Sequence, residues 1–315
     1  MTAGFPAGGE KHRTGLPAVP GEKTETLKSA LKKGTDVLQQ AGIADADLDA
    51  WYLLEYVTGT DRAHYLADPD CIMAEEDKEK YKSCISRRAG RVPLQHITGE
   101  QEFMGLSFHV SEHVLIPRQD TEILVEQALG LLKQGEVPVG GSAPFTGRIL
   151  DLCTGSGCIL ISILHWAQTA LEGVGSDISR EALEVAQENA RNLGQKNAEF
   201  ICSDLFEKIS GTFGMIVSNP PYIRSAEIRT LEDEVKLHDP LLALDGKEDG
   251  LYFYRRITDE AGDYLEPGGY LLFEIGCDQA QDVKSLMEKA GFEETAVVKD
   301  LAGLDRVVLG RMPYR

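Results

Sequence analysis

The sequence lacks several features that define particular classes of protein. No apolar stretch approaches the roughly 18 residues that a membrane-spanning helix needs. Its six cysteines include no Cys-x-x-Cys pair and no regular spacing, so neither a disulfide framework nor a zinc site is indicated. His109 and His113 lie in a strand-like stretch without the glutamate of a zinc-protease helix, so no metal site is predicted.

Basic residues are also scarce relative to acidic ones. The chain has 32 Lys and Arg against 51 Asp and Glu, which gives a formal net charge of −19. Proteins that track a phosphate backbone rely on basic surfaces, so this balance argues against a direct nucleic-acid substrate, although it is compatible with a local basic groove.

The hydrophobic pattern divides the chain into four segments. Residues 1–23 are rich in Gly and Pro without a signal-peptide core, which predicts a disordered tail and a cytoplasmic protein. Apolar residues at helical spacing over 24–42, 47–59 and 75–90 predict a helical bundle within residues 24–92. Two β-type runs, 95–99 and 106–110, predict a β-hairpin that links the bundle to the rest, over residues 93–120.

Strands and helices alternate over the last segment, residues 121–315. The strands are almost continuously apolar, which predicts a parallel sheet covered on both faces. The final strands, 295–298 and 306–309, are expected to pair as an antiparallel hairpin. The predicted fold is therefore α/β, with a seven-stranded, mostly parallel, Rossmann-like sheet. A terminal hairpin of this kind is typical of class I methyltransferases rather than of dinucleotide dehydrogenases.

A glycine-containing loop follows the first strand of this sheet and opens a helix. Glycines let the backbone turn tightly and approach a ligand, and ligands of such sheets bind at the carboxyl ends of the strands. The predicted cofactor-binding residues are Asp151, Cys153, Thr154, Gly155, Ser156 and Gly157 in this loop, and Asp177, Asp204 and Leu205 after the next two strands.

The acidic residues around this loop favour S-adenosylmethionine over NAD. Asp177 follows about twenty residues later, where a carboxylate accepts from ribose hydroxyls. Asp151 would favour a sulfonium and repel a pyrophosphate, and Asp204 is placed to accept from an adenine amino group beside Leu205. The third glycine of the dinucleotide motif is replaced by Leu160. Structural roles remain open for Asp151, as an acceptor of local amides, and for Asp204, as a helix cap.

The tetrapeptide Asn219-Pro220-Pro221-Tyr222 follows the fourth strand of the sheet. Consecutive prolines end the ladder of a strand and leave carbonyls free. The Asn219 side-chain oxygen and the Pro220 carbonyl are each expected to accept one N–H of a planar nitrogen, while Tyr222 offers a flat face. Because rate would come from positioning, no general base is required, and none is obvious in the sequence. We therefore predict that Asn219, Pro220 and Tyr222 are catalytic, and that Pro221 also contacts the substrate.

Over nearly its full length after the tail, the chain resembles the HemK/PrmC family of peptide chain release factor glutamine methyltransferases. The matching stretches include residues 87–90, 93–99, 102–103, 151–157 and 217–222, and the most specific is Leu115-Ile116-Pro117-Arg118-Gln119-Asp120-Thr121-Glu122.

The resemblance implies that S-adenosylmethionine methylates the side-chain nitrogen of the glutamine in the Gly-Gly-Gln loop of release factors. It implies that the helical segment helps to hold the release factor and that Asn219 also binds cofactor. Phe103 would lie near the cofactor and Arg118 near the substrate, although core packing of Phe103 and a surface ion pair of Arg118 with Asp120 or Glu122 are open alternatives.

Some features of the chain depart from the family pattern or leave its substrate open. Cys153 replaces a more usual Gly, which fits if its backbone angles are ordinary; Gln119 replaces a common Pro, and Leu205 stands where some members have an aromatic residue. A glutamine of a ribosomal protein and an amino group of a nucleic acid remain alternative substrates.

Overall fold

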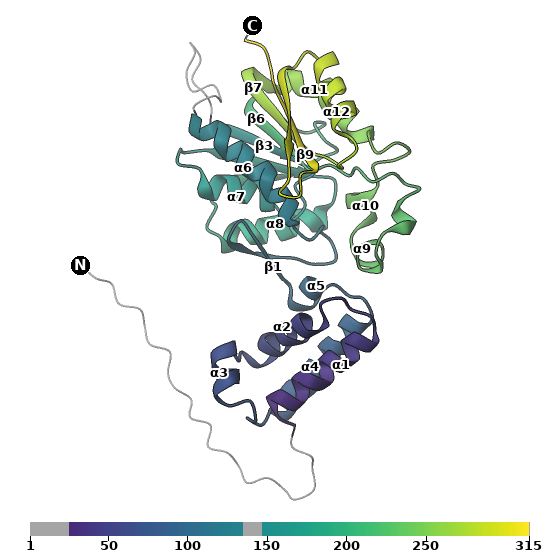
Figure 1. Cartoon of the computed structure of the whole chain (residues 1–315). Coiled ribbons are helices and arrows are strands. Elements are labelled where there is room, and N and C mark those ends of the chain that lie inside the picture. The colour runs from purple at the N-terminus through teal and green to yellow at the C-terminus, as the bar shows by residue number, and fades with distance from the viewer. Residues whose placement is uncertain (1–24, 135–146, 315) are drawn as a thin grey trace, which may run out of the picture. The chain divides into compact units, whose positions relative to one another are not determined.

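The computed structural model of the protein describes residues 25–134 and 147–314. The chain forms two compact units, Met1–Ile85 and Ser86–Arg315 (Figure 1). The predicted tail, residues 1–23, lies outside the described residues. Within the described ranges, no helix is both long and apolar enough to cross a bilayer.

The first unit is built from helices. They are α1 (Leu27–Gln40), α2 (Ala46–Thr58), α3 (Arg62–Ala67) and the greater part of α4 (Glu75–Ala89). Thr26 caps α1 through a reciprocal pair of hydrogen bonds with Ser29, and Gly59 ends α2 in the left-handed conformation. Helices were predicted over the α1, α2 and α4 regions, but the short α3 was missed because six residues carry too little periodicity.

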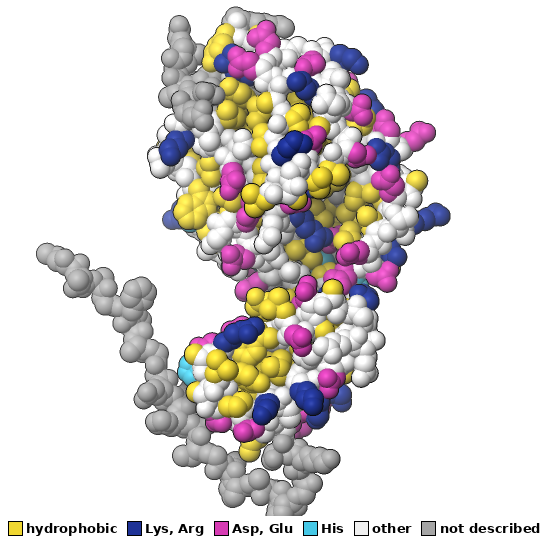
Figure 2. Space-filling view, viewed as in Figure 1, with side chains coloured by type: hydrophobic (Ala, Val, Ile, Leu, Met, Phe, Trp, Pro, Cys, Tyr) yellow, Lys and Arg dark blue, Asp and Glu magenta, His cyan; other side chains and the backbone are white. Residues whose placement is uncertain are grey.

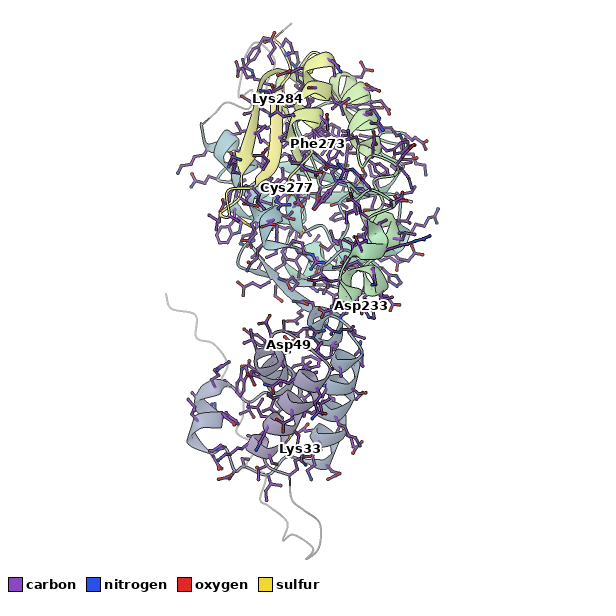
Figure 3. All side chains as sticks on the ribbon, turned by 45° about the vertical axis from the view of Figure 1, so that its right-hand side comes forward. Lys33, Asp49, Asp233, Phe273, Cys277 and Lys284 are labelled. Carbon is purple, nitrogen blue, oxygen red and sulfur yellow. The ribbon has the colours of Figure 1, made fainter. Side chains whose placement is uncertain are left out.

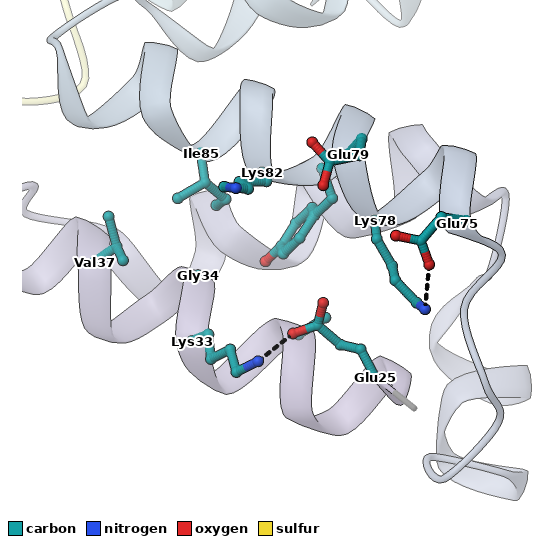
Figure 4. A pocket seen from close by; sticks show the side chains of 11 residues that line it. Glu25, Lys33, Gly34, Val37, Glu75, Lys78, Glu79, Lys82 and Ile85 are labelled. Carbon is teal, nitrogen blue, oxygen red and sulfur yellow. Dashed lines mark hydrogen bonds and ion pairs between the residues drawn. The ribbon is translucent and has the colours of Figure 1, made fainter. Parts of the chain in front are cut away.

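A cavity of about 550 Å³ lies beside α1 and α4 in this unit (Figure 4). Its charged groups are largely paired among themselves: Lys33 Nζ lies 2.6 Å from Glu25 Oε1, and Lys78 Nζ lies 2.7 Å from Glu75 Oε2. The Tyr81 hydroxyl donates to the Ala50 carbonyl at 3.1 Å.

The second unit opens with a short helix and a hairpin. The predicted strand at residues 95–99 is wrong: residues Leu94–Thr98 form helix α5, which starts after Pro93 and ends at Gly99 in the left-handed conformation. The hairpin pairs β1 (Glu100–Phe103) with β2 (Leu106–His109). Met104 and Gly105 both have positive φ, as a tight two-residue hairpin turn requires. Proline and glycine therefore bounded a helical turn that residue propensities alone had assigned to a strand.

A seven-stranded sheet forms the centre of this unit, with the order β5-β4-β3-β6-β7-β9-β8. Its strands are β3 (Arg148–Leu152), β4 (Glu172–Asp177), β5 (Ala198–Cys202), β6 (Phe213–Ser218), β7 (Leu265–Glu274), β8 (Glu293–Lys299) and β9 (Asp305–Arg311). Strands β3 to β7 pair in parallel, whereas β9 is antiparallel to both β7 and β8. The predicted mostly parallel sheet with a terminal antiparallel hairpin is confirmed.

Helices cover both faces of the sheet, as Figure 1 shows. They are α6 (Gln119–Gln134), α7 (Cys158–Trp166), α8 (Arg180–Asn192), α11 (Tyr252–Tyr264) and α12 (Ala280–Lys289). Neighbouring strand residues join different cores: Ile149 packs with α6 and α7, whereas Leu150 packs with α11 and α12. Alternation of this kind explains why the middle strands of the sheet carry apolar residues toward both faces.

The connection between β6 and α11 was not resolved into elements by the sequence. It contains η1 (Ile228–Thr230), α9 (Asp233–His238) and α10 (Leu241–Leu244). Ion pairs tie it to the start of the unit: Arg88 Nη2 lies 2.9 Å from Glu234 Oε1, and Arg118 Nη2 lies 2.7 Å from Asp239 Oδ2. These long-range contacts fold the connection back toward the carboxyl ends of the strands.

Candidate active site

A cavity of about 480 Å³ opens where the strand order reverses, between β3 and β6. Crevices at this position are the usual ligand sites of open α/β sheets. It is lined by residues that follow β3, β4, β5 and β6, by parts of residues 112–121, and by residues of the connection to α11. The cavity therefore gathers most of the predicted site residues in one place.

The loop after β3 is fixed to the neighbouring strand through its own backbone. Thr154 N–H donates to the Ser176 carbonyl at 3.0 Å, and Gly155 N–H donates to Asp177 Oδ2 at 2.9 Å. Gly157 has φ +79° and packs so closely that a Cβ there would lie 2.9 Å from the Ile161 side chain. Glycine at this position is thus required by both conformation and space.

Cys153 does not have the ordinary backbone angles that would let it fit without strain. Its φ is +59°, in the left-handed region where a side chain is disfavoured and glycine is not. The residue is half-buried and packs at the edge of the core that contains α11. The replacement of glycine by Cys153 therefore places strain in the cofactor loop.

Replacing Cys153 by glycine is expected to raise the free energy of unfolding by about 1 kcal/mol. A left-handed residue with a Cβ costs about 1–2 kcal/mol in the folded protein, and the greater conformational entropy of glycine in the unfolded chain offsets part of this gain. Cys153→Ala is the matched control, because it removes the sulfur and keeps the Cβ. Urea unfolding of the three proteins measures the difference; if the alanine and glycine variants are equally stable, the strain is absent.

Asp151 lies behind the loop rather than facing the cavity. It is fully buried, and the Thr154 hydroxyl donates to its Oδ2 at 2.6 Å. Burial raises its pKa to about 7, although the hydrogen bond from Thr154 opposes this rise. Asp151 does not line the cavity and shapes the loop from within, whereas its predicted contact with a cofactor stays a prediction.

The raised pKa of Asp151 makes folding stability depend on pH. Its pKa moves from an ordinary 3.8 to about 7, so the folded protein holds this proton more tightly than the unfolded chain. The contribution is fully present below pH 4 and is lost as pH rises toward 7. Asp151→Asn should therefore lose less thermal stability than the unaltered protein between pH 5 and pH 8. Asp263→Asn, at an exposed position, is the control; equal losses in all three proteins would contradict the assignment.

Three acidic or apolar residues predicted at the other strand ends do line the cavity. Asp177 Oδ1 accepts from the Ser179 N–H at 2.9 Å, so the carboxylate joins the glycine loop to the start of α8. Asp204 Oδ1 lies 2.9 Å from Arg256 Nη1, a partner on α11 that the sequence did not indicate. Leu205 is almost fully buried with φ +48°. The cavity wall at this end thus combines carboxylates with an apolar surface.

Asn219 and Pro221 line the cavity, whereas Tyr222 does not. The hydroxyl of Tyr222 instead lies 3.5 Å from Glu274 Oε1, and its carbonyl accepts from Gln279 Nε2 at 3.0 Å. Burial, followed by the nearby Glu274, raises the pKa of the phenol. Tyr222 is half-buried, and its role as a flat face for a substrate stays a prediction.

The two site residues predicted near the hairpin, Arg118 and Phe103, lie in different surroundings. Arg118 lines the cavity and pairs with Asp239 across 121 positions of the sequence, rather than with Asp120 or Glu122. Phe103 is buried and packs edge-on against Phe108 with ring centroids 6.0 Å apart. Its ring lies in the core and does not line the cavity, as the alternative of core packing predicted, and its contact with the cofactor stays a prediction.

A buried carboxylate next to the tetrapeptide was missed. Glu274, the last residue of β7, is fully buried, and its burial raises its pKa to about 7. The only signal in the sequence was a single charge inside the apolar run Leu271-Leu272-Phe273-Glu274-Ile275. Charged side chains are rarely fully buried unless they are paired.

Two family models match successive parts of the chain. Residues 29–99 match the family model of the PrmC N-terminal domain, and residues 139–235 match that of the methyltransferase small domain. The chain is 43% identical over 287 residues to the release factor glutamine methyltransferase of Agrobacterium fabrum, an alignment that covers 91% of this chain and 97% of that protein. The chain belongs to the family of release factor glutamine methyltransferases.

A second member of the family and one solved structure are also similar to this chain. The family member from Clostridium acetobutylicum is 40% identical over 287 residues, covering 90% of this chain and 97% of its own length. A release factor-specific protein-(glutamine-N5) methyltransferase from Alicyclobacillus acidocaldarius is 30% identical, covers 65% of this chain and 99% of that one, and superposes with a TM-score of 0.38. The resemblance seen in the motifs is confirmed, and the chain is a methyltransferase.

Proposed function

We propose that this enzyme transfers a methyl group from S-adenosylmethionine to the side-chain amide nitrogen of the glutamine in the Gly-Gly-Gln motif of peptide chain release factors. The observation that carries the proposal is Asn219, whose amide side chain faces the cavity at the switch point of the sheet. The class of substrate is inferred from family membership, and the mode of catalysis is inferred from the residues of the cavity.

The cavity residues fit S-adenosylmethionine. A Cβ built on Gly155 meets no atom within 4 Å, so the loop faces open space. Asp177 receives one N–H on each oxygen and keeps further lone pairs for ribose hydroxyls. The loop residues Cys153, Thr154, Gly155 and Ser156 would hold the amino-acid part, and Asp204 and Leu205 the adenine. When bound, the cofactor supplies an electrophilic methyl group on a positively charged sulfur.

Asn219 and Pro220 orient the amide nitrogen that receives this methyl group. An amide nitrogen is a weak nucleophile because its lone pair is delocalised, so two acceptors that hold its hydrogens fix its direction of attack. Asn219 Oδ1 and the Pro220 carbonyl serve as these acceptors. The proton leaves after transfer, and the gain in rate comes from positioning and electrostatics rather than from a strong base.

Release factors are favoured over nucleic acids as the partner. The net charge is −19, and acidic and basic side chains are interspersed on the face drawn in Figure 2 rather than gathered into a basic surface. The helical segment, residues 24–92, is proposed to contact the release factor. Along α2, Leu48, Tyr52 and Tyr56 repeat every four residues and are each more than 40% exposed, which suits a protein partner. Such a substrate implies a cytoplasmic enzyme.

Incubation with labelled S-adenosylmethionine tests this function. Separate reactions with a release factor, ribosomal proteins and DNA are expected to label the release factor, and a release factor with Gly-Gly-Ala in place of Gly-Gly-Gln is expected to stay unlabelled. Label on ribosomal protein or DNA, with none on the release factor, would replace the proposed substrate by the one labelled.

A further inference from the structure

We propose that Glu274 is a positioning residue that locks the side-chain amide of Asn219 with its oxygen toward the substrate. The proposal rests on the function assigned above to Asn219, and it concerns a residue that touches neither cavity nor cofactor. Glu274 ends β7 directly after Phe273, which is labelled in the interior of the larger unit in Figure 3.

The first observation is the direction of the Asn219 amide. An asparagine side chain presents an acceptor on one branch and two donors on the other, and the two branches have nearly the same shape. The surroundings must therefore select which branch faces the cavity. Asn219 Nδ2 lies 3.5 Å from Thr121 Oγ1 on α6, a residue that is almost fully buried although it borders the cavity. This contact leaves Oδ1 for the cavity.

The second observation is the group that accepts hydrogen bonds in the interior, the carboxyl of Glu274. Thr121 and Asn219 both lie within hydrogen-bonding reach of the Glu274 carboxyl and lower its pKa against the larger effect of burial. A hydroxyl that donates to a carboxylate keeps its lone pairs for Asn219 Nδ2. An ionised carboxylate accepts only, so Glu274 forces donors from Thr121, Asn219 and Tyr222 to point inward.

The contacts of the Glu274 carboxyl are long or poorly aligned. Tyr222 Oη lies 3.5 Å from Glu274 Oε1, and Oε2 is buried without a well-aligned partner among the described residues. Arg306 is near, but its guanidinium bonds to Asp120 at 3.1 Å and Asp300 at 3.2 Å. A buried charge with so few firm partners is costly, which favours a functional reason for keeping it.

The charge on Glu274 predicts a pH dependence of the reaction. Burial raises its pKa to about 7, so the carboxylate form increases above that pH. A protonated Glu274 donates one hydrogen bond and no longer compels Asn219 to point its NH₂ inward. The charged or titratable groups that face it are Arg306 on β9, Asp120 on α6, Cys158 at the start of α7, Tyr222 after β6 and Tyr254 on α11. Turnover should therefore fall as the pH drops below about 7.

Glu274→Gln tests the proposal, because it keeps the shape and allows either end of the new amide to face Asn219. We expect kcat on the release factor to fall about ten- to hundredfold, the effect of losing one hydrogen bond to a charged group. The affinity for S-adenosylmethionine and the melting temperature should change little at pH 8, and the acidic limb of the pH profile should disappear. Glu126→Gln, exposed on α6, is the control and should keep the full profile.

A double-mutant cycle separates positioning from a structural role. If Glu274 acts through Asn219, then Glu274→Gln should cause no further loss in an enzyme that already carries Asn219→Ala. Losses that multiply, or a Glu274→Gln enzyme with unchanged kcat and pH profile, would overturn the proposal while leaving the proposed function intact. An unaltered enzyme that binds S-adenosylmethionine but never labels a release factor would overturn the function instead.

Discussion

Asn219→Ala is expected to lower kcat on the release factor by about 10²–10³-fold, which corresponds to about 3–4 kcal/mol of transition-state stabilisation. Alanine removes the acceptor that orients the amide nitrogen and leaves the strand before it intact, because Ser218 is held by its own hydrogen bond to the Leu152 carbonyl at 2.8 Å. Single-turnover measurements with labelled S-adenosylmethionine give the rate of the chemical step directly.

Two controls show whether the loss of activity arises in the chemical step. The affinity of the variant for S-adenosylmethionine, measured by calorimetry, should remain close to that of the unaltered enzyme. Asn192→Ala, at an exposed position on α8, should keep full activity. Turnover at the normal rate in the Asn219 variant would remove this residue from the mechanism.

Asp177→Ala is expected to weaken binding of S-adenosylmethionine about 10- to 100-fold, since charged hydrogen bonds contribute about 1.5–3 kcal/mol each. The carboxylate has two tasks in the structure: it accepts from the backbone of Gly155 and Ser179, and it offers its remaining lone pairs to the cavity. Its loss removes both the ribose acceptors and the anchor of the glycine loop.

Calorimetric titration of S-adenosylmethionine measures this loss, with exposed Asp259→Ala as the control. Asp177→Asn separates the two tasks, because it keeps an acceptor for one backbone amide while it loses the charge. It should bind cofactor with intermediate affinity. Equal affinity in the alanine variant and the unaltered enzyme would show that Asp177 contributes to cofactor binding neither directly nor through the loop.

The sequence was informative wherever a local pattern dictates the result. Near-continuous apolar strands, the Ser179 cap of α8 and the glycines after β3 each follow from neighbours in the chain. Residues 94–98 gave the wrong element because isoleucine and threonine favour strands, whereas Pro93 and Gly99 bound a short helix. Five residues are too few for periodicity to decide between these alternatives.

The tertiary structure decided which of the predicted site residues line the cavity and which do not. Phe103 was expected near the cofactor and Tyr222 against the substrate; Phe103 is almost fully buried in the core, whereas Tyr222 is half-buried with its hydroxyl 3.5 Å from Glu274 Oε1. Arg118 was correctly expected at the cavity, but its partner, Asp239, is distant in the sequence. The direction of a side chain relative to a cavity depends on packing between elements, which no local motif specifies.

By itself the sequence determined the class of fold, the family and the position of the glycine loop and the Asn219 tetrapeptide at the carboxyl ends of neighbouring strands. Those features follow from strand alternation and from motifs whose residues are contiguous. Only the tertiary structure decided that Asp151 lies behind its loop, that Cys153 has a left-handed backbone, and that Glu274 is buried beside Tyr222. Burial and backbone angles arise when distant segments pack together, and they alone set the pKa values and orientations on which the chemistry depends.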